Sequence, residues 1–170
     1  QALPELAVLD DRWLVYNHGG LGALEELLAK PVPTGVVEVW GDGSGTSFDK
    51  PAGIGVVVDW PNGRSRSLIS ENIGQGTNNR AELMAIWRGL QEVPDRLQPI
   101  LVRSDSEYAI GSLTKPWSPQ KNKELIASIR ADLSLRTSVT FQHVRGHAGV
   151  EQNELCDRLA KAGRTQQLPD

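Results

Sequence analysis

The sequence predicts an α/β domain with a mixed five-stranded sheet flanked by helices. Three observations support this: three strand-like segments follow one another with short links, an amphipathic helix comes next, and helix and strand patterns then alternate. Three successive strands with short links favour an antiparallel meander. The alternation that follows adds the remaining strands and helices.

The elements can be assigned in order from their residue patterns. Turn residues such as Pro61-Asn62-Gly63 separate the first strands. The first long helix shows apolar residues recurring at i, i+3, i+4 and i+7. We expect strands at Val36–Trp40, Gly53–Trp60, Arg64–Asn72, Ile100–Arg103 and Val139–Val144, and helices at Arg80–Val93, Glu107–Leu113, Lys123–Leu135 and Glu151–Gly163.

The chain divides into one main domain with an extension. Residues 1–34 form the expected N-terminal extension, which includes helical spacing over Ala23–Lys30 and ends at Pro31 and Pro33. Residues 35–164 form the expected catalytic domain, and residues 165–170 a C-terminal tail. A chain of 170 residues is long enough for one substantial core and short for two.

Composition limits the classes of function. A net charge of −3 and a pI near 5.7 argue against a protein that holds nucleic acid by bulk electrostatics, so any such contact must come from a local patch. A single cysteine, Cys156, excludes an internal disulfide framework and is expected to be buried. No apolar run approaches the roughly 20 residues that span a bilayer, and no signal peptide is visible. We expect a cytoplasmic monomer without membrane contact.

Four carboxylates lie where predicted elements begin or end. Asp42 follows the first strand, Glu82 is in the first turn of the first long helix, Asp105 follows the fourth strand, and Asp157 is in the last helix. Such ends meet at one edge of an α/β sheet, so the four groups can share a cleft. Crowded carboxylates repel one another unless cations neutralise them, and oxygen-only ligands favour Mg²⁺ or Mn²⁺. Two such ions can promote phosphodiester cleavage.

Simpler interpretations remain open for each residue taken alone. Asn79 and Glu82 have the spacing of a capping box, and Asp157 can be an ordinary solvated helix residue. Asp42 and Asp105 can belong to turns. His143 and His147 are four apart, but Gly146 interrupts any regular element between them, and His143 is expected to be structural.

Four segments closely resemble the type 1 ribonuclease H family: VWGDGS at 39–44, TNNRAEL at 77–83, SDSEY at 104–108, and VRGHAG at 144–149 running on to NELCD at 153–157. They occur in the family's order and the resemblance covers about 130 residues, from Gly35 to Arg164. It implies the RNase H-like fold and an endonuclease that cuts the RNA strand of RNA/DNA hybrids. The cut would use two Mg²⁺ ions, for which Mn²⁺ can substitute, and leave 5′-phosphate and 3′-hydroxyl ends.

The resemblance also implies residue roles. Asp42, Glu82, Asp105 and Asp157 would bind the metals, and His147 would assist proton movement or product release. The family seats a DNA phosphate and contacts 2′-hydroxyls of the RNA. By resemblance, Thr77 and Asn122 match the phosphate pocket, Asn78 and Asn79 match minor-groove contacts, and Ser44 would face the RNA strand.

The chain departs from the family pattern at three places. Ser47–Pro51 replaces a Gly-Asn-Pro-Gly loop, and Gln75 replaces an arginine often found in the phosphate pocket. The segment between Tyr108 and Asn122 is too short for the basic handle of many relatives, which leaves Trp117 as either a packing surface for the substrate or a lid on the core.

Three rival functions match the sequence less well. A proofreading-type exonuclease would need Asp-x-Glu where this chain has Asp42-Gly43-Ser44, and a transposase or integrase core would need a later acid in a motif that is absent. A non-catalytic hybrid-binding domain with the same fold would be expected to have lost at least one acid, yet all four are present together with His147. The sequence therefore favours the nuclease.

Overall fold

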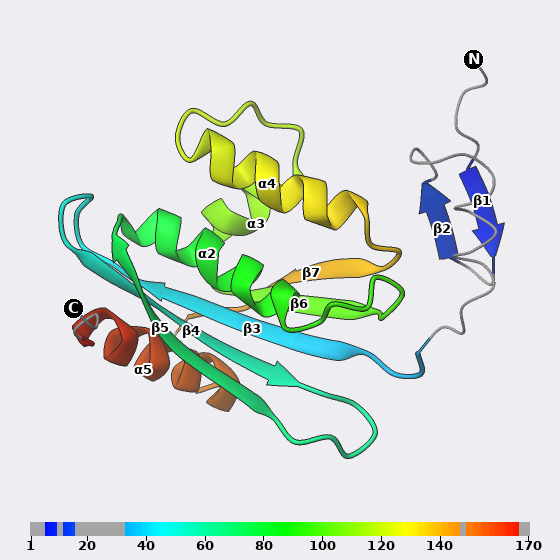
Figure 1. Cartoon of the computed structure of the whole chain (residues 1–170), viewed down its shortest axis with the longest axis horizontal. Coiled ribbons are helices and arrows are strands. Elements are labelled where there is room, and N and C mark those ends of the chain that lie inside the picture. The colour runs from blue at the N-terminus through cyan, green and yellow to red at the C-terminus, as the bar shows by residue number, and fades with distance from the viewer. Residues whose placement is uncertain (1–5, 10–11, 16–32, 147–148, 167–170) are drawn as a thin grey trace.

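A computed structural model describes residues 6–9, 12–15, 33–146 and 149–166 (Figure 1). Its main feature is a five-stranded sheet in the order β5-β4-β3-β6-β7. β3 pairs antiparallel with β4 and β4 with β5, whereas β3 pairs parallel with β6 and β6 with β7. The predicted mixed sheet is confirmed, and its strands are β3 Val37–Ser44, β4 Pro51–Asp59, β5 Ser67–Gln75, β6 Ile100–Ser104 and β7 Val139–His143.

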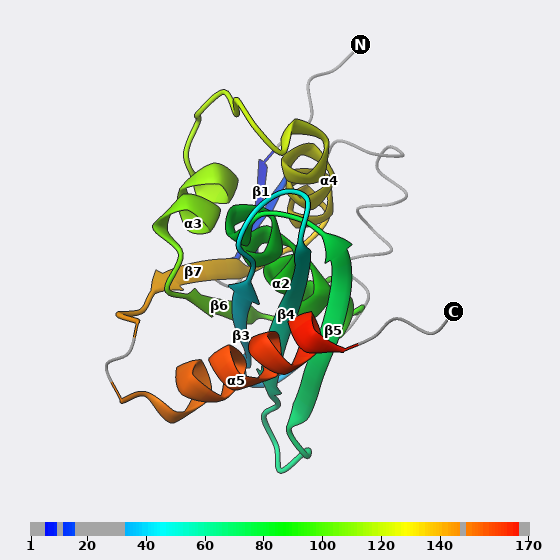
Figure 2. The same cartoon turned by 90° about the vertical axis from the view of Figure 1, so that its left-hand side faces the viewer.

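The helices cover both faces of the sheet. α2, α3 and α4 lie on one face and α5 lies on the other, as the two views show together (Figures 1 and 2). Their bounds are α2 Asn78–Gln91, α3 Glu107–Thr114, α4 Lys123–Ser134 and α5 Glu151–Thr165. Within the described part of the chain, no helix is both long and apolar enough to cross a membrane.

The N-terminal extension contains two short strands that the sequence analysis did not predict. β1, Leu6–Leu9, pairs antiparallel with β2, Arg12–Val15, in a separate two-stranded sheet. Strands of four residues are too short for a periodicity argument to detect. The helix expected over Ala23–Lys30 lies outside the described residues.

Two element boundaries differ from the prediction, and both bear on the site. β3 continues to Ser44, so Asp42 lies inside the strand opposite Gly55 rather than after it, and the turn interpretation of Asp42 is wrong. α2 begins at Asn78, because the Thr77 side chain caps it by accepting a hydrogen bond from the Arg80 amide at 3.2 Å. Asn79 is therefore no cap, and Glu82 lies in the second turn rather than the first.

Apolar side chains pack in two layers, one on each side of the sheet. The larger layer joins α2, α3 and α4 to the sheet, whereas Trp40, Val57 and Cys156 form the centre of the layer under α5. A Cβ at Gly55 would overlap the Cys156 carbonyl oxygen, so α5 rests directly on the backbone of β4. Cys156 is fully buried there, as the sequence predicted.

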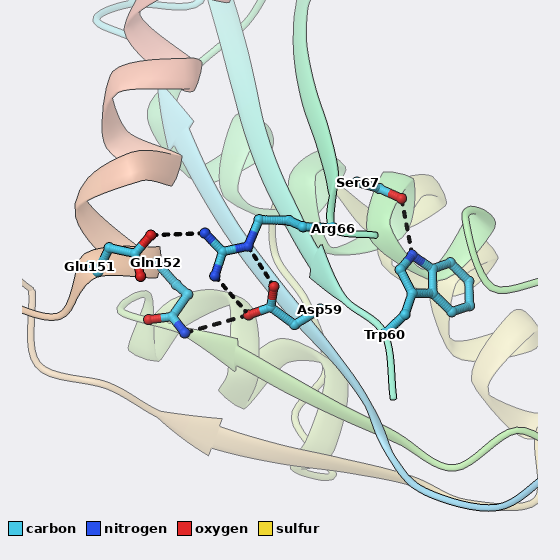
Figure 3. Close-up of polar contacts among 6 residues, drawn as sticks. All are labelled: Asp59, Trp60, Arg66, Ser67, Glu151 and Gln152. Carbon is cyan, nitrogen blue, oxygen red and sulfur yellow. Dashed lines mark hydrogen bonds and ion pairs between the residues drawn. The ribbon is translucent and has the colours of Figure 1, made fainter. Parts of the chain in front are cut away.

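A polar cluster attaches the beginning of α5 to the β4–β5 hairpin (Figure 3). Arg66 donates to Asp59 through Nε (2.6 Å) and Nη2 (3.3 Å), and to Glu151 through Nη1 (2.8 Å). Gln152 also donates to Asp59, at 3.4 Å. These contacts join the first turn of α5, the helix that carries Asp157, to the β4–β5 hairpin.

Candidate active site

Three of the four predicted carboxylates meet at one edge of the sheet. Asp42 from β3, Glu82 from α2 and Asp105 from the end of β6 each offer an oxygen, and these oxygens lie within 4.8 Å of one another. Asp42 is 6% exposed and Glu82 is 5% exposed, whereas Asp105 is half-buried. The three groups come from distant parts of the chain, so the fold itself assembles the cluster.

Two glycines make this close approach possible. A Cβ on Gly43 would lie 2.5 Å from the Glu82 amide nitrogen and 2.7 Å from the Ala81 Cβ, so only glycine lets α2 lie against β3 at this point. A Cβ on Gly146 would lie 2.9 Å from Oδ2 of Asp105. The backbone therefore passes Asp105 immediately before residue 147.

Burial and mutual repulsion make the cluster electrostatically unfavourable when it is ionised. The pKa of Glu82 is raised by burial first and then by the charges of Asp42 and Asp105. The pKa of Asp42 is raised by burial, by Asp105 and, more weakly, by Asp157, although the Gly43 amide donates to its Oδ1 at 3.0 Å. Oε2 of Glu82 is buried without a hydrogen-bond partner among the described residues.

Such a cluster suits a hard divalent cation. A buried carboxylate oxygen without a donor is costly unless a cation or a proton satisfies it. All three ligands are carboxylates, and oxygen donors of this kind favour Mg²⁺ or Mn²⁺ over softer ions. The donor set and the orphaned oxygen of Glu82 therefore fit the metal that the sequence predicted.

The fourth carboxylate, Asp157, lies on α5 outside this group. Its Oδ2 accepts a hydrogen bond from Nζ of Lys161 at 2.8 Å, one turn further along the helix. The pair is largely exposed on the lysine side, and exposed pairs of this type contribute little to stability.

The structure describes one of the two histidines singled out in the sequence, His143. His143 ends β7, and its Nε2 lies 3.1 Å from the backbone oxygen of Asp105, which agrees with the structural role expected of it. His147 lies outside the described residues. Its predicted role in proton movement stays a prediction.

The predicted phosphate-binding residues line one pocket of about 430 Å³. Thr77 and Asn79 approach it from the start of α2, and Asn122 approaches it from the start of α4. Asn122 has a left-handed backbone (φ 56°) and its side chain donates to the Tyr108 hydroxyl at 3.1 Å rather than capping α4. The pocket therefore connects the two helix starts that the sequence analysis paired.

The other predicted nucleic-acid contacts, Asn78 and Ser44, do not line this pocket. Oδ1 of Asn78 accepts from the Gly45 amide at 3.1 Å, which leaves the amide nitrogen of Asn78 free to donate elsewhere. Ser44 ends β3 and is buried, and Gln75 ends β5 in an exposed position. Sequence reasoning missed Arg130, which also lines the pocket, because its helical position indicates only a solvated residue.

Comparison with known proteins identifies the family that this geometry resembles. The family model described as RNase H matches residues 34–165. Ribonuclease H of Actinobacillus pleuropneumoniae is 35% identical over 141 residues, which cover 75% of this chain and 90% of that protein. Ribonuclease HI of a Synechocystis species is 32% identical, over 74% of this chain and 86% of that protein.

Solved structures agree with the sequence comparison. The RNase H1 called LC11, isolated from compost by a metagenomic approach, superposes with a TM-score of 0.64 at 29% identity and covers 75% of this chain and 94% of its own. RNase H1 from the halophilic archaeon Halobacterium salinarum gives a TM-score of 0.63 at 27% identity, covering 76% and 97%.

Proposed function

Because this chain belongs to the RNase H family, we propose that it is an endonuclease that hydrolyses the RNA strand of RNA/DNA hybrids. The observation that carries the proposal is the buried cluster of Asp42, Glu82 and Asp105, with an oxygen of Glu82 left without a donor. A cluster of this kind has no stabilising role of its own, since its charges repel one another. Cations bound to the cluster next to a phosphodiester would neutralise this repulsion.

The three clustered carboxylates would hold the metal. Asp42 would be the shared ligand, because it lies in the cluster and the charge of Asp157 also acts on it. Asp157 would complete a second site by exchanging Lys161 for the cation. Two Mg²⁺ ions bound there, or Mn²⁺ in their place, would activate a water and stabilise the leaving oxygen. Hydrolysis would join the water oxygen to phosphorus and break the bond to the 3′ oxygen, which takes up a proton as the water loses one, so that 5′-phosphate and 3′-hydroxyl ends result.

The remaining site residues would orient the substrate and handle protons. Thr77 and Asn122 would hold a phosphate of the DNA strand in the pocket, at the start of the helix that also carries Glu82. From Thr77 to Glu82 is five residues, about 7.5 Å along the helix axis, so one short helix segment links phosphate binding to the acids. Asn78, Asn79 and Ser44 would contact the minor groove and the RNA strand, and His147 would assist proton movement.

The decisive experiment compares cleavage of a labelled RNA/DNA hybrid with cleavage of matched duplex RNA and duplex DNA. Each substrate is incubated with and without Mg²⁺, and Asp105→Asn serves as the control for a contaminating nuclease. We expect cleavage of the RNA strand of the hybrid alone, only with metal and only in the parent protein. Tight hybrid binding without any metal-dependent cleavage would instead support the alternative, a non-catalytic hybrid-binding domain with this fold.

A further inference from the structure

The segment that joins α3 to α4 forms the outer wall of the pocket. Residues 115–122 contain no helix or strand, and six of them line the cavity. A segment of this length without regular hydrogen bonds has many accessible conformations unless side chains hold it. Its shape must therefore be maintained from outside the segment.

Arg130 on α4 holds this segment at several points. Its Nε and Nη2 donate to the Ser112 carbonyl at 3.0 and 2.6 Å, and Nη2 also donates to the carbonyls of Lys115 (3.3 Å) and Trp117 (3.1 Å). One guanidinium therefore joins the end of α3, the first connector residue and the tryptophan. Carbonyl acceptors are neutral, so the positive charge of Arg130 remains uncompensated by them at the wall of the pocket.

Trp117 is held in place from two further sides. A Cβ on Gly111 would overlap Cζ3 and Cη2 of the indole, so the ring rests directly on the α3 backbone. The ammonium of Lys115 lies 4.7 Å from the ring centroid. Trp117 is nevertheless 49% exposed, so it is no lid on the core: much of the ring faces solvent beside the pocket.

We propose that Arg130 is a positioning residue for substrate binding: it clamps the connector so that Trp117 forms a fixed packing surface for the sugar next to the phosphate that occupies the pocket. This inference rests on the proposed function and concerns the DNA strand of the hybrid. A ring held in its binding position before the substrate arrives loses little conformational freedom on binding, which improves affinity. The clamp would thus contribute hybrid affinity that many relatives obtain from a basic handle.

The chemistry of the clamp requires arginine. The Ser112 carbonyl accepts from both Nε and Nη2, while Nη2 also reaches the carbonyls of Lys115 and Trp117. The paired donors on one side of a planar guanidinium fix this geometry, whereas an ammonium on a flexible stem has no second nitrogen to fix it. Arg130→Lys therefore keeps the charge and removes most of the clamp. Arg130→Gln removes both.

The test measures hybrid affinity and turnover separately. Affinity is obtained from the fluorescence anisotropy of a labelled hybrid with each variant in a non-cleaving Asp105→Asn background, and KM and kcat are obtained with Asp105 present. For Arg130→Lys, Arg130→Gln and Trp117→Ala we expect Kd and KM to rise about tenfold, within the range for loss of one aromatic contact with nucleic acid, and kcat to change less than about twofold. The double variant of Arg130→Gln with Trp117→Ala should be no worse than either single one.

Arg136 provides a matched control for loss of structure. It follows α4, and its guanidinium donates to the carbonyls of Val93 (2.6 Å) and Leu90 (2.9 Å), away from the pocket. Arg136→Lys should lower the melting temperature without changing Kd for the hybrid. Gly111→Ala tests the position of Trp117 while keeping Arg130, because the added Cβ displaces the indole. This variant should lose as much hybrid affinity as the Arg130 variants. It replaces Arg130→Gln in the test if that variant fails to fold.

The possible results separate the two proposals. If Arg130→Lys binds the hybrid within about twofold of the parent, charge rather than the clamp matters and the inference is overturned. Additive losses in the double variant would also overturn it, since Arg130 would then act without Trp117. A parent protein that binds the hybrid but never cleaves it would contradict the proposed function alone, because the anisotropy measurements still decide the role of Arg130.

Discussion

Replacing Asp105 by asparagine should disable the metal site and stabilise the metal-free protein. The oxygens of Asp42, Glu82 and Asp105 lie within 4.8 Å of one another. Two unit charges at that separation repel by about 1 kcal/mol at the dielectric constant of water and about 3.5 kcal/mol at an effective value near 20. Because the raised pKa values of Asp42 and Glu82 keep them partly protonated, we expect the lower half of this range to apply.

The effect has a defined dependence on pH. Carboxyl groups whose pKa is raised by folding bind more protons in the folded than in the unfolded state, so stability falls as pH rises above their ordinary values of 3.8 and 4.5. Asp105→Asn should flatten that fall. At pH 8 without metal, a gain of about 1–2 kcal/mol corresponds to a melting temperature about 2–8 °C higher than that of the parent. At pH 4 and below the difference should shrink, since Asp42 and Glu82, whose pKa values are raised, are then largely protonated and no longer repel Asp105.

Thermal unfolding followed by circular dichroism checks this prediction at several pH values, with a chelator and then with Mg²⁺. The parent should gain stability with Mg²⁺, because a ligand that binds only the folded state stabilises it, and the variant should gain much less. Glu107→Gln is the matched control: it removes an exposed charge two residues away and should retain both cleavage and the Mg²⁺ effect. Full hybrid cleavage by Asp105→Asn, or a stabilisation that does not vary with pH, would refute the reasoning.

Four further predictions use other parts of the molecule. Gly43→Ala should lower both stability, by about 1–3 kcal/mol, and cleavage, because its Cβ would collide with the start of α2; a melting temperature equal to that of the parent would contradict this. His147→Ala should slow turnover by roughly 100-fold or less and keep Mg²⁺ binding by calorimetry, whereas lost metal binding would make it a ligand. A chain starting at Gly35 should keep its activity with a lower melting temperature; a folded but inactive truncated protein would place the extension in the substrate site. Log Kd for the hybrid should rise with log salt with a shallow slope of about 2 or less, at about 0.9 per phosphate contact, and a steeper slope would reveal a second basic surface.

Much of the site was predictable because the acids occur in motifs that also define their elements. Asp42 and Glu82 each belong to a short segment that the family shares, and both reach the cluster as expected. Their local settings were predicted less well. β3 continues past Asp42, where glycines on β3 and β4 let the neighbouring helices pack closely against the strands. Glu82 lies a turn later than expected because Thr77 rather than Asn79 caps α2.

The substrate-binding side was predicted only in part. Thr77 and Asn122 do line one pocket, as their motifs indicated. The role of Arg130 could not be predicted, because it depends on hydrogen bonds to carbonyls 13 to 18 residues away in the chain. Trp117 was open to two interpretations for the same reason: whether a tryptophan is buried or exposed depends on what packs against it, here Gly111.

By itself, the sequence determined the order of strands and helices from residue 35 onward, the four candidate carboxylates and the family, because periodicity and short motifs are properties of neighbouring residues. Only the tertiary structure decided which acids meet, that Asp157 pairs with Lys161, and how the wall of the pocket is held. Those outcomes depend on close approaches between segments far apart in the chain, such as α2 against Gly43 and α4 against the connector. Steric fit and hydrogen-bond direction across such distances leave no periodic trace in the sequence, so they appear only when the chain is folded.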